Sequence, residues 1–92
     1  MNAAEDNLTP VFRFVSDQGH AWLEVPLSLI DELGISMGIS RYSYRRGASA
    51  YLEEDCDYHF FADAMKLHNR SFEFREVYEE NTVIRWYASF TN

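Results

Sequence analysis

Short runs in which apolar and polar residues alternate most constrain how this chain of 92 residues can fold. Alternation with a period of two is typical of β-strands that bury one face. Turn-forming residues separate the paired runs, for example at Gly19 and at Gly47, and this combination indicates β-hairpins. The sequence therefore predicts six strands in three hairpins, formed by 11–15 with 21–25, by 39–45 with 48–53, and by 72–78 with 82–90.

Two segments between the predicted hairpins have the apolar spacing of helices. In the first, Pro26 suits the opening turn of a helix and Gly34 suits a left-handed C-terminal cap, which predicts a helix over 26–33. In the second, an apolar stripe rich in aromatic residues predicts a helix between Asp57 and Asn69. We therefore expect an α+β fold of order ββαββαββ, with an antiparallel sheet of three hairpins and both helices packed on one face.

The length of the chain predicts one domain, which we place over 10–92, preceded by a flexible tail over 1–9. Of all residues, 47% are hydrophobic and 16% are aromatic, so some Tyr and Trp side chains should remain on the surface, where they often anchor partners. Trp86 continues an apolar stripe and is expected in the core. Trp22 is either an exposed anchor or a cover for the second face of the sheet.

The charge of the chain is acidic, with 15 Asp and Glu against 8 Lys and Arg and a net charge of −7. A negative surface argues against direct contact with nucleic acid or an anionic membrane, and it favours a protein partner with a basic surface. The sequence shows neither a signal peptide nor an apolar run approaching the ~20 residues of a membrane span. We therefore expect a cytoplasmic protein.

The densest polar cluster lies between the second hairpin and the second helix and contains Glu53, Glu54, Asp55, Cys56 and Asp57. Carboxylates near a helix start complement its dipole, and Asp55 or Asp57 can cap its first turn. We favour this interpretation. A metal or thiol site around Cys56, Asp57 and His59 is the alternative, because their side chains are all of metal-ligand types. Their spacing matches neither a calcium-binding loop nor a zinc pattern.

Cys56 is the only cysteine of the chain. A nucleophilic thiol needs a positioned base, and every histidine is isolated in the sequence. The neighbouring carboxylates also disfavour the thiolate. We therefore expect a buried structural thiol, and we predict no catalytic residue, no cofactor and no bound metal.

Three arginines, Arg41, Arg45 and Arg46, alternate with Tyr42 and Tyr44. Such interleaving can hold single-stranded nucleic acid by stacking and phosphate contacts. With only three arginines in an acidic protein, we favour pairing with acidic residues across the sheet, such as Glu53, Glu73 or Glu76. A protein-binding patch is the alternative.

Several short stretches resemble a pattern shared by small uncharacterised proteins of bacterial accessory and mobile DNA, including phages and plasmids. They are GHAWLEVP at 19–26, ELGI at 32–35, IS at 39–40, YSY at 42–44 and AYLEEDCD at 50–57. The resemblance covers roughly residues 19–66. It implies a bacterial or phage cytosolic setting, and it carries over no site residue because the family has no established activity.

The leading hypothesis for function is a small acidic protein-binding module without enzymatic activity. Its specific form is a phage or plasmid accessory protein that inhibits a host nucleic-acid-binding defence protein, of the anti-CRISPR or anti-restriction type. The alternatives are a self-associating accessory subunit, which leaves a homodimer open, and the metal or thiol site described above. The candidate interaction residues are Glu53, Glu54, Asp55, Asp57, Trp22, Tyr42 and Tyr44.

Overall fold

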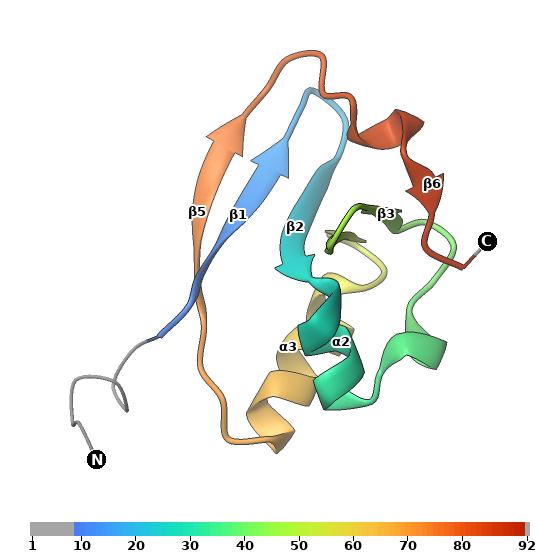
Figure 1. Cartoon of the computed structure of the whole chain (residues 1–92). Helices are drawn as coiled ribbons and strands as arrows, with labels where there is room; N and C mark the ends of the chain where they lie inside the picture. The colour runs from blue at the N-terminus through green and yellow to red at the C-terminus, as the bar shows by residue number, and fades with distance from the viewer. Residues whose placement is uncertain (1–8, 92) are drawn as a thin grey trace.

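The computed structural model describes residues 9–91 (Figure 1). The predicted tail over 1–9 therefore lies, except for Thr9, outside the described residues. In chain order the elements are strands β1 (Val11–Ser16) and β2 (Ala21–Pro26), helix α2 (Leu27–Leu33), 3₁₀-helix η1 (Ser36–Gly38), strands β3 (Tyr44–Arg46) and β4 (Ser49–Glu53), helix α3 (Tyr58–Leu67), strand β5 (Glu73–Tyr78), 3₁₀-helix η2 (Ile84–Trp86) and strand β6 (Ala88–Ser89).

The strands form one six-stranded sheet of order β5-β1-β2-β4-β3-β6, which confirms the α+β class. The β1–β2 and β3–β4 hairpins are confirmed. The third hairpin is wrong, because β5 pairs with β1 in parallel and β6 pairs with β3 at the opposite edge. Figure 1 shows the connection from β5 to β6 crossing the end of the sheet.

Both helices pack on one face of the sheet, as the sequence predicts. Their buried side chains form one core with the inward-facing residues of β2 and β4, and it contains Leu23, Val25, Leu29, Ile30, Leu33, Ile39, Ala50, Leu52, Phe61, Ala64, Met65 and Phe90. Phe60 belongs to the predicted apolar stripe but is exposed, and its ring lies against Gly38, where a Cβ atom would be 2.4 Å from Cζ. Gly38 therefore allows η1 to approach α3.

Backbone geometry places the ends of both helices within two residues of the predicted ends. Pro26 stands at the N-cap of α2, and Gly34 after its last turn has φ of 69°. The amide of Ile35 donates to the carbonyl of Ile30 at 3.3 Å, which closes the C-terminal turn. Asn69, the predicted stop of the second helix, has φ of 56° and lies two residues beyond the end of α3.

A second, smaller core lies on the sheet face opposite the helices. It consists of Val15, Trp22, Tyr51 and Ile84, with Tyr44 and Tyr87 packed against it. Ile84 comes from the connection between β5 and β6, where the predicted strand over 82–90 is replaced by η2 and the short β6. This 3₁₀ turn directs Ile84 inward, whereas Trp86 is 80% exposed, so the expected core position of Trp86 is wrong.

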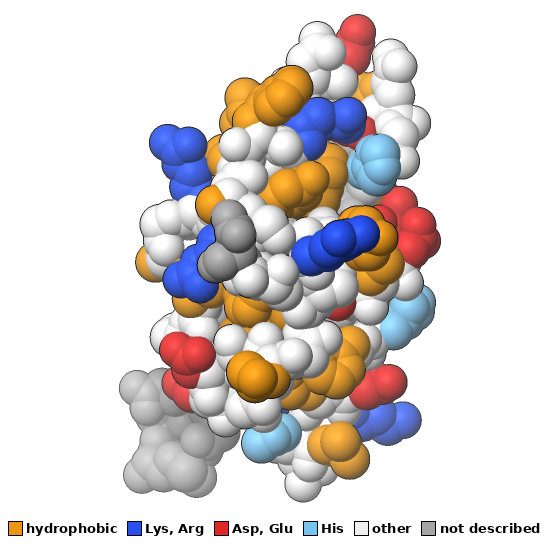
Figure 2. Space-filling view, turned by 90° about the vertical axis from the view of Figure 1, so that its right-hand side faces the viewer, with side chains coloured by type: hydrophobic (Ala, Val, Ile, Leu, Met, Phe, Trp, Pro, Cys, Tyr) orange, Lys and Arg blue, Asp and Glu red, His pale blue; other side chains and the backbone are white. Residues whose placement is uncertain are grey.

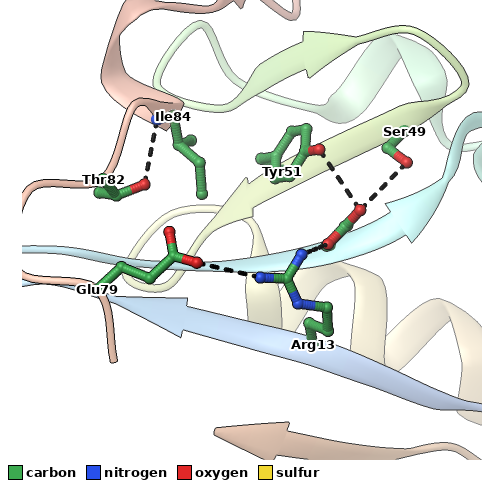
Figure 3. Close-up of polar contacts among 7 residues, drawn as sticks. Arg13, Ser49, Tyr51, Glu79, Thr82 and Ile84 are labelled. Atoms are coloured by element: carbon green, nitrogen blue, oxygen red, sulfur yellow. Dashed lines mark hydrogen bonds and ion pairs between the residues drawn. The ribbon is translucent and has the colours of Figure 1, made fainter. Parts of the chain in front are cut away.

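A polar network ties the same connection to the sheet (Figure 3). Arg13 on β1 forms ion pairs with Glu24 at 2.9 Å and with Glu79 at 3.3 Å. The hydroxyl of Tyr51 donates to Glu24 at 3.4 Å, and the amide of Ile84 donates to the Thr82 hydroxyl at 3.1 Å.

Within residues 9–91, no helix has the length and apolar character needed to cross a membrane.

Candidate functional site

A hollow of about 220 Å³ opens beside strand β3. We call it the aromatic–acidic pocket, and it is lined by His20, Trp22, Tyr42, Tyr44, Glu53, Asp55 and Cys56. These residues come from the end of the β1–β2 turn, from β2, from the loop and strand at 42–44, and from the end of β4 and the turn after it. Figure 2 faces the β3–β6 side of the molecule, where hydrophobic side chains reach the surface among basic and histidine side chains, with carboxylates at one rim.

Trp22 forms the buried base of the aromatic group. The imidazole of His20 stacks on its indole ring at 5.8 Å and 21°, and the ring of Tyr44 meets it edge-on at 6.3 Å. Trp22 is only 2% exposed, which answers the question that the sequence left open. Its indole Nε1–H is buried and has no hydrogen-bond partner among the described residues. A buried donor without an acceptor costs about 1–3 kcal/mol.

Glu53 supplies a carboxylate that is almost withdrawn from water, since the residue is 8% exposed. Register between β2 and β4 places Glu53 opposite Trp22. Its Oε1 accepts the backbone N–H groups of Asp55 at 2.9 Å and of Cys56 at 2.8 Å. Glu53 therefore shapes the turn before α3, and Asp55, in that turn, is exposed at the pocket.

Asp57 stands at the N-cap position of α3 but makes no capping hydrogen bond, so the predicted cap is wrong. Its carboxylate is 2% exposed and instead accepts the Ser40 amide at 3.0 Å, the Ser40 hydroxyl at 2.7 Å and the Ser43 hydroxyl. These serines have further hydrogen bonds, because the amide of Tyr42 donates to Ser40 Oγ at 3.1 Å and that of Glu53 donates to Ser43 Oγ at 2.9 Å.

The Asp57 network positions the aromatic side of the pocket against its acidic side. It holds the 40–43 loop, which leads into β3, onto the turn between β4 and α3. It also explains why the predicted strand over 39–45 is reduced to Tyr44–Arg46, since the backbone before Tyr44 turns toward Asp57. Sequence reasoning missed Ser40 and Ser43, whose only signal is that small hydroxyl residues flank Tyr42.

The pocket brings together most of the predicted interaction residues, namely Trp22, Tyr42, Tyr44, Glu53 and Asp55. Two others lie elsewhere. Asp57 is buried in its serine network, and Glu54 lines a different hollow with Phe14 and Glu76. Burial, followed by the charges of Asp55 and Glu53, raises the pKa of the Glu54 carboxyl. The pocket adds His20, which the sequence did not single out, and Cys56, which the sequence named only in the alternative metal or thiol site.

Cys56 is exposed, so the expected buried thiol is wrong. A hydrogen bond with the Glu53 carboxylate, with the nearby charges of Asp57 and Asp55, raises the pKa of this thiol above its ordinary value. The thiol is therefore protonated at neutral pH. In the alternative metal site, Asp57 is committed to serine hydroxyls and His59 faces solvent, and residues 9–91 contain no group of three His, Cys, Asp or Glu suited to a metal ion.

A second hollow of about 350 Å³ adjoins the pocket through their shared residue His20. We call it the turn hollow, and it is lined by Asp17, Gln18, Gly19, His20, Glu80, Asn81, Thr82, Arg85 and Trp86. Arg85 forms an ion pair with the buried Asp17, and its guanidinium carbon lies 6.0 Å from the centre of the Trp22 ring. The β1–β2 turn and η2 are thus joined next to the pocket.

The pKa of Asp17 is set by opposing effects. Burial raises it, but the carboxylate accepts the amides of Gly19 at 3.0 Å and of His20 at 2.9 Å and pairs with Arg85. Together these interactions lower the pKa of Asp17 below its ordinary value.

The three neighbouring arginines do not form the expected ion pairs among the described residues. They lie over aromatic rings instead, Arg41 over Tyr42 at 5.3 Å, Arg45 over Phe90 at 5.7 Å and Arg46 over Tyr87 at 5.1 Å. The predicted ion pairs do not form for two reasons. The Glu53 carboxylate accepts hydrogen bonds within the β4–α3 turn. Strand β5, which carries Glu73 and Glu76, lies at the opposite edge of the sheet.

Comparisons of this chain with protein-family models, curated proteins and solved structures found no match. The resemblance to small proteins of bacterial mobile DNA therefore stays a prediction.

Proposed function

We propose that this protein is a non-enzymatic binding module that captures a basic segment of a partner protein in the aromatic–acidic pocket. The observation that carries the proposal is the convergence of three Trp and Tyr rings, the imidazole of His20 and two carboxylates from distant segments on one hollow. Aromatic faces and carboxylates both attract cations. The overall charge of −7 attracts a basic partner over longer range and speeds its association.

The partial burial of the pocket strengthens its attraction for a cation. Charges withdrawn from water are screened less by solvent and salt than charges on an open surface. Glu53 meets this condition, and its hydrogen bonds from the Asp55 and Cys56 amides fix its orientation before a ligand arrives. A side chain that is already oriented loses less entropy on binding.

Selection of peptides from a random display library against the immobilised protein tests this proposal. We expect the selected peptides to be basic, to bind Tyr42→Ala at least about tenfold more weakly, and to slow maleimide labelling of Cys56 at the pocket rim. Tyr78→Ala is the matched control, because Tyr78 is also an exposed tyrosine but lies on β5. Ligands that are not basic, or that leave Cys56 labelling unchanged, contradict the proposal.

The narrower form of the proposal is an inhibitor that occupies the basic groove of a nucleic-acid-binding defence protein. Such mimicry needs carboxylates on one contiguous face. The acidic cluster is divided among the pocket, a second hollow and the buried Asp57. This division favours capture of individual basic side chains over mimicry of nucleic acid. The salt dependence of partner binding separates the two forms, since a charge mimic loses affinity steeply between about 50 and 500 mM salt, where the Debye length falls roughly threefold.

A second candidate is a self-associating subunit, and the outer edge of β5 favours it. Phe74 and Tyr78 on this edge strand are exposed, and an unpaired strand edge is a template for another strand. In antiparallel pairing of two copies about Phe74, Glu73 of each copy lies opposite Arg75 of the other, because both residues share one sheet face. Light scattering tests this candidate: a single-chain mass at high concentration, unchanged in Phe74→Lys, eliminates it.

A further inference from the structure

We propose that the side chain held in the aromatic–acidic pocket is an arginine within an extended polypeptide. This inference rests on the proposed function and adds the identity of the captured group. It follows from the donors and acceptors that line the pocket, from the shape of its aromatic walls and from the second hollow beside it.

The two carboxylates favour a guanidinium over an ammonium. Glu53 Oε1 is occupied by two backbone amides, whereas the Asp55 carboxylate makes no hydrogen bond or ion pair with another described residue. A planar guanidinium with five N–H donors can engage both carboxylates at once. The ammonium group of lysine is a compact and strongly hydrated charge, so its transfer into a pocket walled by aromatic rings is less favourable.

The aromatic walls match the same group, because a guanidinium stacks on aromatic faces as a flat plate. This protein already uses that contact at Tyr42, where its own Arg41 lies 5.3 Å from the ring centre and donates to the tyrosine hydroxyl at 3.4 Å. Arg41 therefore competes with an incoming arginine. The other nearby cation, Arg85, is paired with Asp17.

The indole N–H of Trp22 is buried at the base of the pocket and has no partner among the described residues, so its resonance reports changes in the pocket without a direct contact to the ligand. The turn hollow, which shares His20 with the pocket, gives room for the residues that flank the arginine. Trp86 at its border is 80% exposed and presents a large apolar surface to them.

Nuclear magnetic resonance of ¹⁵N-labelled protein tests the inference through the Trp22 indole signal, with Trp86→Phe used to assign it. The probe is the acetylated and amidated peptide Gly-Ser-Arg-Ser-Gly, compared with its citrulline and lysine versions and with guanidinium chloride. We expect the arginine peptide to shift the signal, the citrulline peptide to bind at least about tenfold more weakly and the lysine peptide several-fold more weakly. Guanidinium chloride, which lacks the flanking residues, should shift the signal less than the arginine peptide does.

Variants sharpen the test. Asp55→Asn should weaken binding of the arginine peptide by about fivefold or more, whereas Asp31→Asn, an exposed carboxylate on α2, should leave it unchanged. Arg41→Ala should strengthen binding, because it frees a face of Tyr42 and removes a like charge. Each of these residues is exposed, so all three variants should keep the wild-type unfolding midpoint.

Equal binding of the arginine and citrulline peptides overturns the inference, as does a shift that Asp55→Asn does not reduce. The proposed function fails separately. If display-selected peptides protect Cys56 and need Tyr42 but tolerate citrulline, the pocket is a protein-binding site without arginine specificity. If no selected peptide protects Cys56, the proposed function itself is wrong.

Discussion

Ser43 donates its hydroxyl to the carboxylate of Asp57, 14 residues further along the chain, and both residues are almost completely buried. The same hydroxyl accepts the amide of Glu53, so a single oxygen atom links β4, the start of α3 and the loop before β3. The shape of the candidate site depends on this link.

Replacement of Asp57 should therefore destabilise the protein more than replacement of its acidic neighbours. Asp57→Ala leaves the part-buried donors of Ser40 and the buried hydroxyl of Ser43 without an acceptor, and we expect a loss of about 3–5 kcal/mol in the free energy of unfolding. Asp55→Asn, on the exposed side of the same turn, should change it by less than about 0.5 kcal/mol. Urea denaturation followed by circular dichroism measures both, and equal effects would contradict the network.

The two tryptophans should differ in the same way. Trp22→Ala empties the centre of the smaller core and should cost about 3–5 kcal/mol. Trp86→Ala removes an exposed side chain and should change stability by less than about 0.5 kcal/mol. Denaturation of the two variants under identical conditions checks this, and a large loss for Trp86→Ala would show that η2 depends on the indole for its fold.

Acid should weaken the attachment of η2 through Asp17. Because its pKa is lower in the folded protein than in the unfolded chain, Asp17 contributes stability above its unfolded pKa of about 3.9. That contribution disappears as the pH falls through the lower, folded value. Stability measured from pH 6 to pH 2 should thus decline more in the wild type than in Asp17→Asn. Parallel curves for the two proteins would rule out this role for Asp17.

Cys56 should react slowly with alkylating agents at neutral pH. Its pKa is raised, first by the hydrogen bond with Glu53, so the thiolate becomes abundant only above the ordinary value of about 8.5. Glu53→Gln keeps an oxygen acceptor for the turn but removes the charge, and it should move the pH dependence of iodoacetamide labelling to lower pH. Mass spectrometry of the labelled chain gives the rates, and an unchanged profile would exclude Glu53 as the cause.

The local parts of the fold can be predicted from the sequence because they depend on neighbouring residues. The turns at Gly19 and Gly47 define two hairpins, and Pro26 and Gly34 delimit α2. Pairing of β5 with β1 joins segments some sixty residues apart, in register from Val11 opposite Glu73. No local pattern encodes such a pairing.

The candidate site was predictable in composition but not in arrangement. Its aromatic and acidic residues stand out in the sequence, yet Glu54 and Asp57 look the same as Glu53 and Asp55 until the fold separates them. The alternation near Trp86 also resembles a strand, and only packing of Ile84 on the sheet shows that the chain turns there.

The crossing from β5 to β6 has a consequence for the synthesis of the protein. The central strands β1, β2, β4 and β3 are complete before α3 begins, and both outer strands come later in the chain. A nascent chain that has left the ribosome only as far as α3 thus carries a four-stranded sheet with two open borders, of the kind that promotes aggregation. The segment that follows pairs with both of these borders, through β5 and β6, and places Ile84 against Trp22.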